Sequence, residues 1–282
     1  GMATSIPPHN LGEIIDATLH LLEHPEATPN DLMKFVNGPD FPTGGLILGR
    51  AGIMDAYRTG RGSIKTRAKV SIEEGRRGQM QIIVSELPYQ ASCSAIASRI
   101  QELVDGGDLD GIADVNDNSS GGETNLIITL KRDANSNVVM NNLFKLTQLQ
   151  SSFPVNMVAL VKGVPRTVNL RDALVGYVDH QIEVITRRST FRLQKANDRN
   201  HILEGRLKAL NVIDEIIKLI RASEDAASAK EALMGKKYGF TERQAIDILD
   251  MQLRQLTRLS RIDLETEQKD VLARIKELQA IL

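Results

Sequence analysis

The sequence predicts an α+β fold, in which a part with antiparallel strands precedes a long helical part. Residues 64–73 alternate apolar and polar side chains, and a glycine-bounded turn leads from them into a second extended run at 80–87. A further short hairpin is indicated where Lys162-Gly163 separates two apolar runs. Residues 170–222 contain no proline and are dominated by helix formers. These three observations separate a strand-containing part from a helical one.

The first elements are short. Residues 11–24 place apolar side chains at helical spacing and stop before a proline, which predicts an amphipathic helix. Its apolar face comprises Leu11, Ile14, Ile15, Thr18, Leu19 and Leu22. A second helix is expected over 30–35, capped by Asn30 or Asp31. Residues 46–48 predict a short buried strand.

The alternating run at 64–73 has one apolar face and one basic face, preceded by two arginines among glycines. Basic side chains on a strand and amides at glycines are both suited to the phosphates of a nucleic-acid backbone. The candidates for DNA binding are Arg58, Arg61, Lys65, Arg67 and Lys69. Residues 50–77 carry eight basic and three acidic residues, a net charge of +5. A solvated surface explains most such runs, so charge alone leaves both interpretations open.

The remaining elements of the first part alternate helix and strand. Residues 91–105 predict a helix that ends at Gly106-Gly107, and 126–131 predict a strand. The hairpin at 157–168 follows. We therefore expect residues 1–168 to form one α/β domain with antiparallel pairing.

The helical part carries two apolar seams with heptad-like spacing. The first comprises Val178, Ile182, Ile185, Ala196, Leu203, Leu210 and Ile217. The second comprises Leu264, Val271, Ile275, Leu278 and Leu282. Between the seams, Thr241 is expected to cap a further helix, because its side-chain oxygen can accept an amide hydrogen bond. Because neither seam is stable in water alone, each is expected to be buried. An antiparallel helix pair and a packed helical bundle explain this periodicity equally well.

Composition excludes several classes of protein. Of the 282 residues 41% are hydrophobic, and the net charge of −1 argues against a uniformly basic DNA-binding protein. The sequence shows neither a membrane-spanning run nor a secretory signal, so we expect a cytoplasmic protein without a membrane partner. Cys93 is the only cysteine and the histidines lack ligand spacing, so no disulfide and no metal site are expected. No Ser/His/Asp arrangement and no Walker loop are found, and no catalytic residue is assigned.

Near the N-terminus, Ile6 precedes two prolines. Proline fixes φ and restricts the residue before it to extended geometry, so Ile6 is expected on a stiff segment. DNA-bending proteins insert apolar side chains of this kind between base steps. Packing at the start of a helix is the commoner reason for such a pattern, and the residues alone favour it.

Eight blocks lie along the chain at 2–11, 38–43, 56–63, 86–90, 141–144, 147–150, 201–205 and 244–251. The first contains Ile6-Pro7-Pro8-His9-Asn10, and the second reads Gly-Pro-Asp-Phe-Pro-Thr. In this order they resemble the bacterial type IIA topoisomerases, in particular the A chains of DNA gyrase and topoisomerase IV. The resemblance covers essentially the whole chain. The phenylalanine of the second block and a later Gln-Leu-Gln run favour the gyrase branch.

The resemblance implies a fold in four parts. A tower domain (1–168) flanks bound DNA, and an outgoing coiled-coil helix (169–205) leads to a small helical globule (206–261). A truncated returning helix (262–282) completes an antiparallel two-helix coiled coil, which the resemblance favours over a bundle. In the family the globule is the exit gate, or C-gate, of a homodimer. The apolar stripe expected to form this interface comprises Ile246, Leu249, Leu253 and Leu256.

The resemblance also implies roles in DNA handling. Ile6 corresponds to the isoleucine that intercalates and bends the DNA segment to be cut, and His9 of the same block is a further DNA-binding candidate. The family's nucleophile is a tyrosine that directly follows an arginine. None of Tyr57, Tyr89, Tyr177 and Tyr238 does so, which implies that the isolated chain is inactive. Mg²⁺ and ATP are implied to bind the partner B subunit, with no cofactor in this chain.

The expected function is therefore that of the C-terminal part of the breakage–reunion domain of an ATP-dependent DNA gyrase, which supercoils DNA negatively. Its expected partners are DNA, a second copy of the chain and the gyrase B subunit. One alternative is the A subunit of topoisomerase IV, which decatenates DNA. The other is a non-catalytic dimeric coiled-coil protein that binds DNA structurally. Without the resemblance the latter is preferred, because no catalytic residues are visible.

Overall fold

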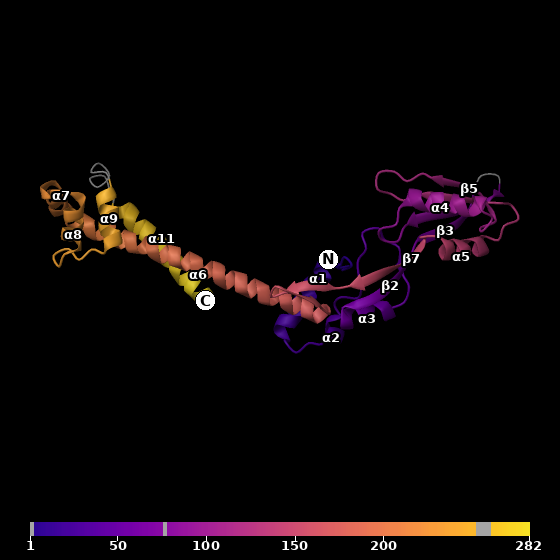
Figure 1. The fold of residues 1–282 in the computed structure, drawn as a ribbon, viewed down its shortest axis with the longest axis horizontal. Coiled ribbons are helices and arrows are strands. Elements are labelled where there is room, and N and C mark those ends of the chain that lie inside the picture. The colour runs from indigo at the N-terminus through magenta and orange to yellow at the C-terminus, as the bar shows by residue number, and fades with distance from the viewer. Residues whose placement is uncertain (1–2, 76–77, 252–260) are drawn as a thin grey trace. The chain divides into compact units, whose positions relative to one another are not determined.

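The computed structural model describes residues 3–75, 78–251 and 261–282. The chain divides into two compact units, Gly1–Val178 and Asp179–Leu282. The described strands all belong to the first unit, and the second is helical (Figure 1). This combination of antiparallel sheets and helices confirms the predicted α+β class. The division between the units falls inside helix α6 (Leu170–Asn211), whereas the predicted domain boundary lies at residue 168.

Helix α1 (Leu11–Glu23) confirms the first predicted helix but not its buried face. It begins at Asn10, whose side chain accepts an amide hydrogen bond from the first turn. The helix buries Ala17 and Leu21. Four side chains of the predicted face are exposed: Leu11, Ile15, Leu19 and Leu22. Apolar residues occur on both sides of this helix, so tertiary contacts decide which side is buried.

Helix α2 (Pro29–Leu32) begins at Thr28, so the predicted cap at Asn30 or Asp31 was wrong. The Thr28 hydroxyl accepts a hydrogen bond from the Asp31 amide at 3.4 Å, and the Asp31 carboxylate accepts one from the Thr28 amide at 3.1 Å. This reciprocal capping box satisfies two amides at once.

An antiparallel sheet of three strands forms the centre of the first unit. Its order is β1-β2-β7, from β1 (Leu46–Ile47), β2 (Arg61–Arg67) and β7 (Gln150–Asn156). Helix α3 (Ala51–Thr59) packs across β2. Neither α3 nor β7 was predicted from the sequence. Leu46 is exposed, so the prediction that β1 is a buried strand was wrong.

The strand predicted at 64–73 is two strands in two sheets. Its first half belongs to β2, and its second half lies in β3 (Lys69–Glu74) of another sheet. Between them Ala68 is buried, and its amide donates a hydrogen bond to the Leu149 carbonyl at 2.7 Å. The chain changes sheet without a proline, a glycine or a break in the alternation. The sequence pattern therefore concealed the junction.

The second sheet is antiparallel with the order β3-β4-β6-β5. Its further strands are β4 (Met80–Glu86), β6 (Leu126–Leu130) and β5 (Ile112–Asp117). β3 and β4 confirm the predicted hairpin. Helices α4 (Cys93–Asp105) and α5 (Ser136–Leu146) cover one face, because their buried side chains share a core with alternate residues of β4 and β6. α4 was predicted, whereas β5 and α5 were not.

A short hairpin completes the first unit. β8 (Val158–Val161) and β9 (Val164–Thr167) confirm the predicted pair. The turn residues Lys162 and Gly163 have φ angles of 52° and 78°. Two positive φ angles are those of a type I′ turn, whose twist matches the flanking strands. The first turns of α6 then pack into the core that α1, α3 and β2 share.

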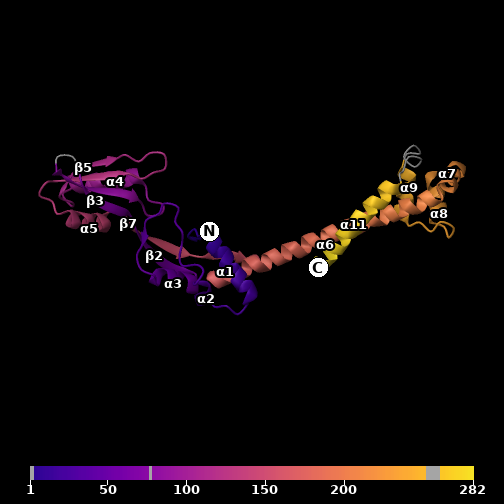
Figure 2. The same cartoon turned by 180° about the vertical axis from the view of Figure 1, so that it is seen from behind.

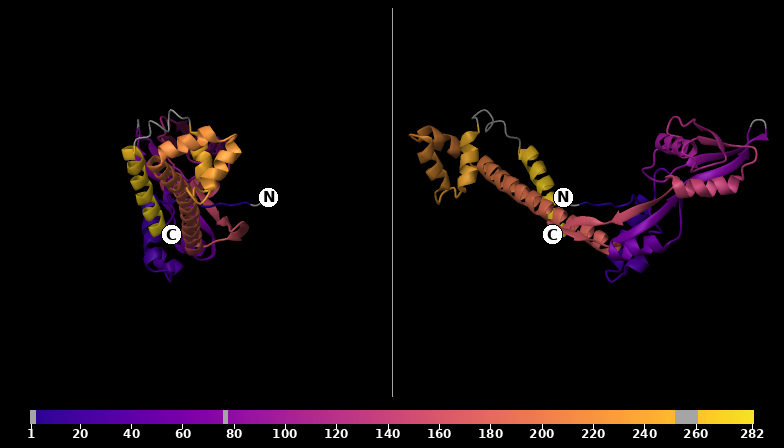
Figure 3. Two further views of the ribbon diagram at one scale, coloured as in Figure 1. Left: turned by 90° about the vertical axis from the view of Figure 1, so that its left-hand side faces the viewer. Right: turned by 45° about the vertical axis from the view of Figure 1, so that its right-hand side comes forward.

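In the second unit, α6 and α11 (Arg261–Ile281) form the predicted antiparallel pair (Figure 3). The Arg199 guanidinium donates two hydrogen bonds to Glu267, at 2.7 and 2.8 Å. Arg261, at the start of α11, bonds to Asn211, at the end of α6. From the first contact to the second, the residue number rises along α6 and falls along α11. The two helices are therefore antiparallel.

The predicted seams are buried only in part. The buried members are Leu203, Leu264, Ile275 and Leu278. Ile182, Ile185 and Leu282 are exposed, in contrast to the prediction. The register set by Arg199 and Glu267 brings the end of α11 opposite Ile185. Ile182 therefore has no α11 residue across from it, and Ile185 and Leu282 lie at the open end of the pair.

Helices α7 (Ile213–Ala222), α8 (Ala226–Met234) and α9 (Glu242–Asp250) form a small globule (Figure 2). Leu233, Phe240 and Ile248 lie in its core. As predicted, α9 begins at Thr241, which forms a capping box with Gln244. Among the described residues, no helix is both long and apolar enough to cross a membrane.

An ion pair of low exposure holds α9 to α6. Arg206 donates two hydrogen bonds of 2.8 Å to Asp247, and the two side chains are 21% and 22% exposed. These bonds raise the pKa of Arg206. We expect Arg206→Ala to cost about 2 kcal/mol, because it removes charged hydrogen bonds and leaves a partly buried carboxylate. Hydrogen exchange of the α9 amides measures this cost.

Arg187→Ala is the matched control for Arg206→Ala. Arg187 pairs with Glu183 on the surface of α6, where the side chains are 73% and 64% exposed. Removing such a pair should cost less than about 0.5 kcal/mol. Equal costs in the two variants would show that the Arg206 pair contributes no more than a surface pair.

Candidate nucleic-acid interface

The exposed face of the β1-β2-β7 sheet presents basic side chains. Along β2, Arg61 and Lys65 are exposed, whereas Ile64 and Thr66 point into the core. The register places Arg61 opposite Asn156 of β7. Directly opposed residues share one face of a sheet, so cations and polar groups lie together on the open side.

Arg61 and Lys65 keep their charged groups available. Neither side chain forms a hydrogen bond or an ion pair with another residue in the described ranges. They lie four residues apart on one strand, a separation of about 13 Å at about 3.3 Å per residue. One strand of B-DNA carries a phosphate every ~3.4 Å of helix axis. Both side chains can therefore reach phosphates of one DNA strand.

Arg67 lies on the same face but contributes to the fold. Its guanidinium donates two hydrogen bonds to Gln150 Oε1, at 2.6 and 2.8 Å, and stacks 4.4 Å from the centre of the Phe144 ring. These contacts join β2 to β7 and α5. Binding of phosphate by Arg67 stays a prediction, with fewer N–H groups left for it.

Lys69 and Arg58 also have protein partners. Lys69 belongs to β3 of the second sheet, so the predicted continuous row of cations along one strand was wrong. Its ammonium lies 3.0 Å from a Glu86 carboxylate oxygen. Arg58, near the end of α3, donates through Nε to Asn30 Oδ1 at 2.9 Å. Their roles in DNA binding stay predictions.

Ile6 projects from a backbone that is anchored on both sides. Before it, Ser5 pairs with Asn156 at the end of β7 through two hydrogen bonds of 2.9 Å. After it, the Pro8 carbonyl accepts a hydrogen bond from the Asp40 amide at 2.9 Å. The Ile6 side chain is nevertheless 48% exposed. An exposed apolar group on a fixed backbone beside a basic face is the arrangement that a DNA wedge requires.

His9 and Tyr57 face each other inside the first unit. His9 Nε2 lies 2.7 Å from Tyr57 Oη, and burial lowers the pKa of His9. Tyr57 is fully buried, and burial also raises its pKa. A buried phenol of raised pKa is a poor nucleophile, which agrees with the rejection of Tyr57 on sequence. Contact between His9 and DNA stays a prediction, because the ring already has a partner.

The predicted dimer stripe is described only in part. Ile246 of α9 is 41% exposed. Leu249 is half-buried against the globule core. Leu253 and Leu256 lie outside the described residues. Of the described members, Ile246 is the one most available to a second copy of the chain.

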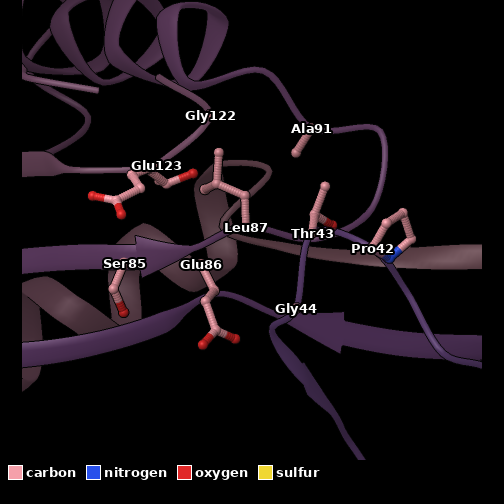
Figure 4. Close-up of a pocket in the computed structure, with 10 residues that line it drawn as sticks. Pro42, Thr43, Gly44, Ser85, Glu86, Leu87, Ala91, Gly122 and Glu123 are labelled. Carbon is pink, nitrogen blue, oxygen red and sulfur yellow. The ribbon is translucent and has the colours of Figure 1, made fainter. Parts of the chain in front are cut away.

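A cavity of about 620 Å³ lies in the first unit, beside the junction of β4 with the following loop (Figure 4). Two of its lining residues, Glu86 and Glu123, are acidic. The Glu86 carboxylate accepts a hydrogen bond from the Gly45 amide at 2.6 Å, and this bond, aided by Lys69, lowers the pKa of Glu86. An acidic lining repels phosphate. The candidate interface is therefore the strand face and not this cavity.

Sequence reasoning missed the polar residues of β7. Gln150 orients Arg67, and Asn156 holds Ser5. The strand contains Pro154, which lacks an amide hydrogen and argues against a central strand. β7 is paired along its length only with β2, so a proline whose nitrogen faces the open edge breaks no ladder bond. The Gln-Leu-Gln run ending at Gln150 was the available signal.

The fold, the anchored isoleucine and the basic strand face agree with the class of topoisomerase subunits that the sequence blocks resemble. A family model that describes the A subunit of DNA gyrase and topoisomerase IV matches residues 1–282, and the chain belongs to this family. It is 49% identical over 283 residues to the DNA gyrase A subunit of Staphylococcus epidermidis, covering 100% of this chain and 32% of that protein.

Other relatives agree. Identity is 49% to the DNA gyrase A subunit of Halalkalibacterium halodurans and 48% to that of Streptococcus pneumoniae, in each case over 100% of this chain and 34% of the relative. The chain thus spans about a third of the length of the curated relatives it matches. The match to this family confirms the resemblance that the sequence blocks carried.

Proposed function

We propose that this chain is the part of a DNA gyrase A subunit that binds and bends the DNA segment to be cut and contributes to the exit gate of a dimer. The observation that carries the proposal is Ile6, exposed between two backbone anchors beside the face that bears Arg61 and Lys65. The relatives, which are named as gyrase A subunits, support it. The partners are DNA, a second copy of the chain and the gyrase B subunit.

The work of this part is mechanical. Smooth bending of a site of 20–30 base pairs costs on the order of 1–6 kcal/mol. An inserted isoleucine from each half of the dimer lowers the cost of kinking the DNA, and the cations offset the remainder through phosphate contacts.

The chemistry of cleavage is assigned outside these 282 residues. In the family the nucleophile is a tyrosine that directly follows an arginine, and none of the four tyrosines of this chain does so. We infer that the isolated chain neither cleaves DNA nor hydrolyses ATP. Mg²⁺ and ATP are held by the partner B subunit; the described residues contain no group of three His, Cys, Asp or Glu side chains that could hold a metal ion.

Charge reversal tests the DNA face. We expect Arg61→Glu with Lys65→Glu to weaken DNA binding and to flatten the slope of log K against log salt by about 3.6, since each copy in the dimer loses two phosphate contacts and each lost contact removes about 0.9. The measurement is a salt titration of DNA affinity in the reconstituted full-length enzyme, which contains both the A and the B subunits.

The matched control reverses two exposed cations of the first unit away from this face. Lys34→Glu with Arg99→Glu changes the net charge equally, and both side chains are more than half exposed. The control should leave the slope unchanged. Equal slopes in the two double variants would refute phosphate contacts by Arg61 and Lys65.

The second candidate is the A subunit of topoisomerase IV, because the family model covers both enzymes. The names of the relatives favour gyrase. Negative supercoiling of relaxed plasmid by the reconstituted full-length enzyme supports gyrase, whereas decatenation without supercoiling supports topoisomerase IV. A full-length protein that binds DNA but never cleaves it supports the structural coiled-coil alternative.

A further inference from the structure

Asn156 forms four hydrogen bonds with residues 3–5, directly before Ile6. Its side-chain Nδ2 donates to the Ala3 carbonyl at 2.9 Å. Its backbone amide donates to the Ser5 carbonyl, and its carbonyl accepts from the Ser5 amide, both at 2.9 Å. The same carbonyl accepts from the Thr4 hydroxyl at 3.2 Å. One residue at the end of β7 thus binds three consecutive residues of the segment.

The side chain of Asn156 adds a second point of attachment to the backbone pair that Asn156 forms with Ser5. Ser5 and Asn156 form an isolated bridge, so no neighbouring pair of a regular strand reinforces it. The bond from Nδ2 to the Ala3 carbonyl fixes a second point of the chain, two residues before Ser5. A segment held at two points cannot pivot about Ser5.

Only one half of the Asn156 amide is used. The Oδ1 atom is buried and has no hydrogen-bond partner in the part of the chain that the structure describes. The amide orientation is assigned from its hydrogen bonds, and the opposite orientation would place two acceptors face to face at Ala3. What the side chain contributes is therefore an N–H donor.

We propose that Asn156 is a positioning residue for Ile6, which acts through the segment it binds and not through contact with DNA bases. This inference rests on the proposed role of Ile6 as a wedge. A side chain inserted between base steps pushes back on its own backbone, so both sides of Ile6 need an anchor. The Pro8 carbonyl and Asp40 supply one anchor, and Asn156 supplies the other.

The test uses the reconstituted full-length enzyme with a DNA duplex that carries a fluorescent donor and acceptor at its ends. Asn156→Ala removes the donor N–H group without adding charge to the basic face. We expect the ratio of bent to unbent bound DNA to fall by at least about fivefold, the effect of one net hydrogen bond in one chain of the dimer. The salt dependence of binding should not change, because Arg61 and Lys65 are untouched.

Ser152→Ala is the matched control on β7. Ser152 is exposed on the same face, opposite Lys65, and does not bond to residues 3–5. This variant should keep the ratio of the unaltered protein. Equal melting temperatures of the two variants would exclude a general loss of fold.

Combination with Ile6→Ala separates positioning from a merely structural role. If Asn156 acts through Ile6, then Asn156→Ala has no further effect on bending in the Ile6→Ala background. Additive losses would overturn the inference, and so would unchanged bending in Asn156→Ala alone while Ile6→Ala loses it. Unchanged bending in Ile6→Ala would instead overturn the proposed wedge itself.

Discussion

Replacing Ile6 by alanine is expected to reduce the ratio of bent to unbent DNA by at least about 30-fold. The substitution removes three carbon atoms from the wedge, worth about 2 kcal/mol at roughly 0.8 kcal/mol per buried CH₂ group. A dimer inserts two wedges, so the combined loss is larger still. Because Ile6 is 48% exposed, the fold should be little affected. Energy transfer between dyes at the two ends of the DNA measures the bend in the reconstituted full-length enzyme.

Loss of bending should also slow supercoiling, since cleavage requires the bent segment under the proposed function. Leu19→Ala is the matched control, because Leu19 of α1 is similarly exposed at 53% but lies outside the anchored segment. This variant should bend DNA normally. If Ile6→Ala and Leu19→Ala behave alike, Ile6 is an ordinary surface residue and the wedge assignment fails.

Gly52→Ala is expected to destabilise the first unit by at least about 3 kcal/mol. A Cβ at Gly52 would lie 2.0 Å from the Ser63 carbonyl oxygen and 2.8 Å from its carbon. Gly62 is similarly close, since its Cβ would meet the Gly52 carbonyl oxygen at 2.6 Å. Both neighbours are backbone atoms, so α3 and β2 would have to separate. Native-state hydrogen exchange of the β2 amides measures the loss.

Gly176→Ala is the matched control for this substitution. Gly176 lies in α6, and no heavy atom lies within 4 Å of the Cβ it would gain. Alanine is the better helix former, so this variant should gain up to about 1 kcal/mol. A small effect of Gly52→Ala would mean that α3 and β2 are less closely packed than the structure shows. Since β2 bears Arg61 and Lys65, Gly52→Ala should also weaken DNA binding.

Much of the fold follows from local sequence signals. The turn at Lys162-Gly163 and the cap at Thr241 were predicted because a few adjacent residues suffice to form them. The pairing of α6 with α11 was left open between two arrangements by periodicity, and the family resemblance favoured the correct one. The exit of the chain from β2 into a second sheet at Ala68 had no local signal at all.

The sequence predicted which residues belong to the candidate site, but not which of them have protein partners. The sequence located the cations, but their partners are distant in the chain: Gln150 for Arg67, Glu86 for Lys69 and Asn30 for Arg58. Which positive charges remain for DNA depends on these contacts.

The sequence by itself determined the family, the α+β class, the hairpins, the cap at Thr241 and Ile6 on its proline-stiffened segment. Each of these rests on neighbouring residues or on a matched block. The tertiary structure alone decided which face of α1 is buried, where one strand becomes two, and that Arg61 and Lys65 are the available members of the five predicted cations. It also brought Asn156 to the segment before Ile6, across about 150 residues of chain. Such contacts depend on packing between distant segments, which neither propensity nor periodicity encodes.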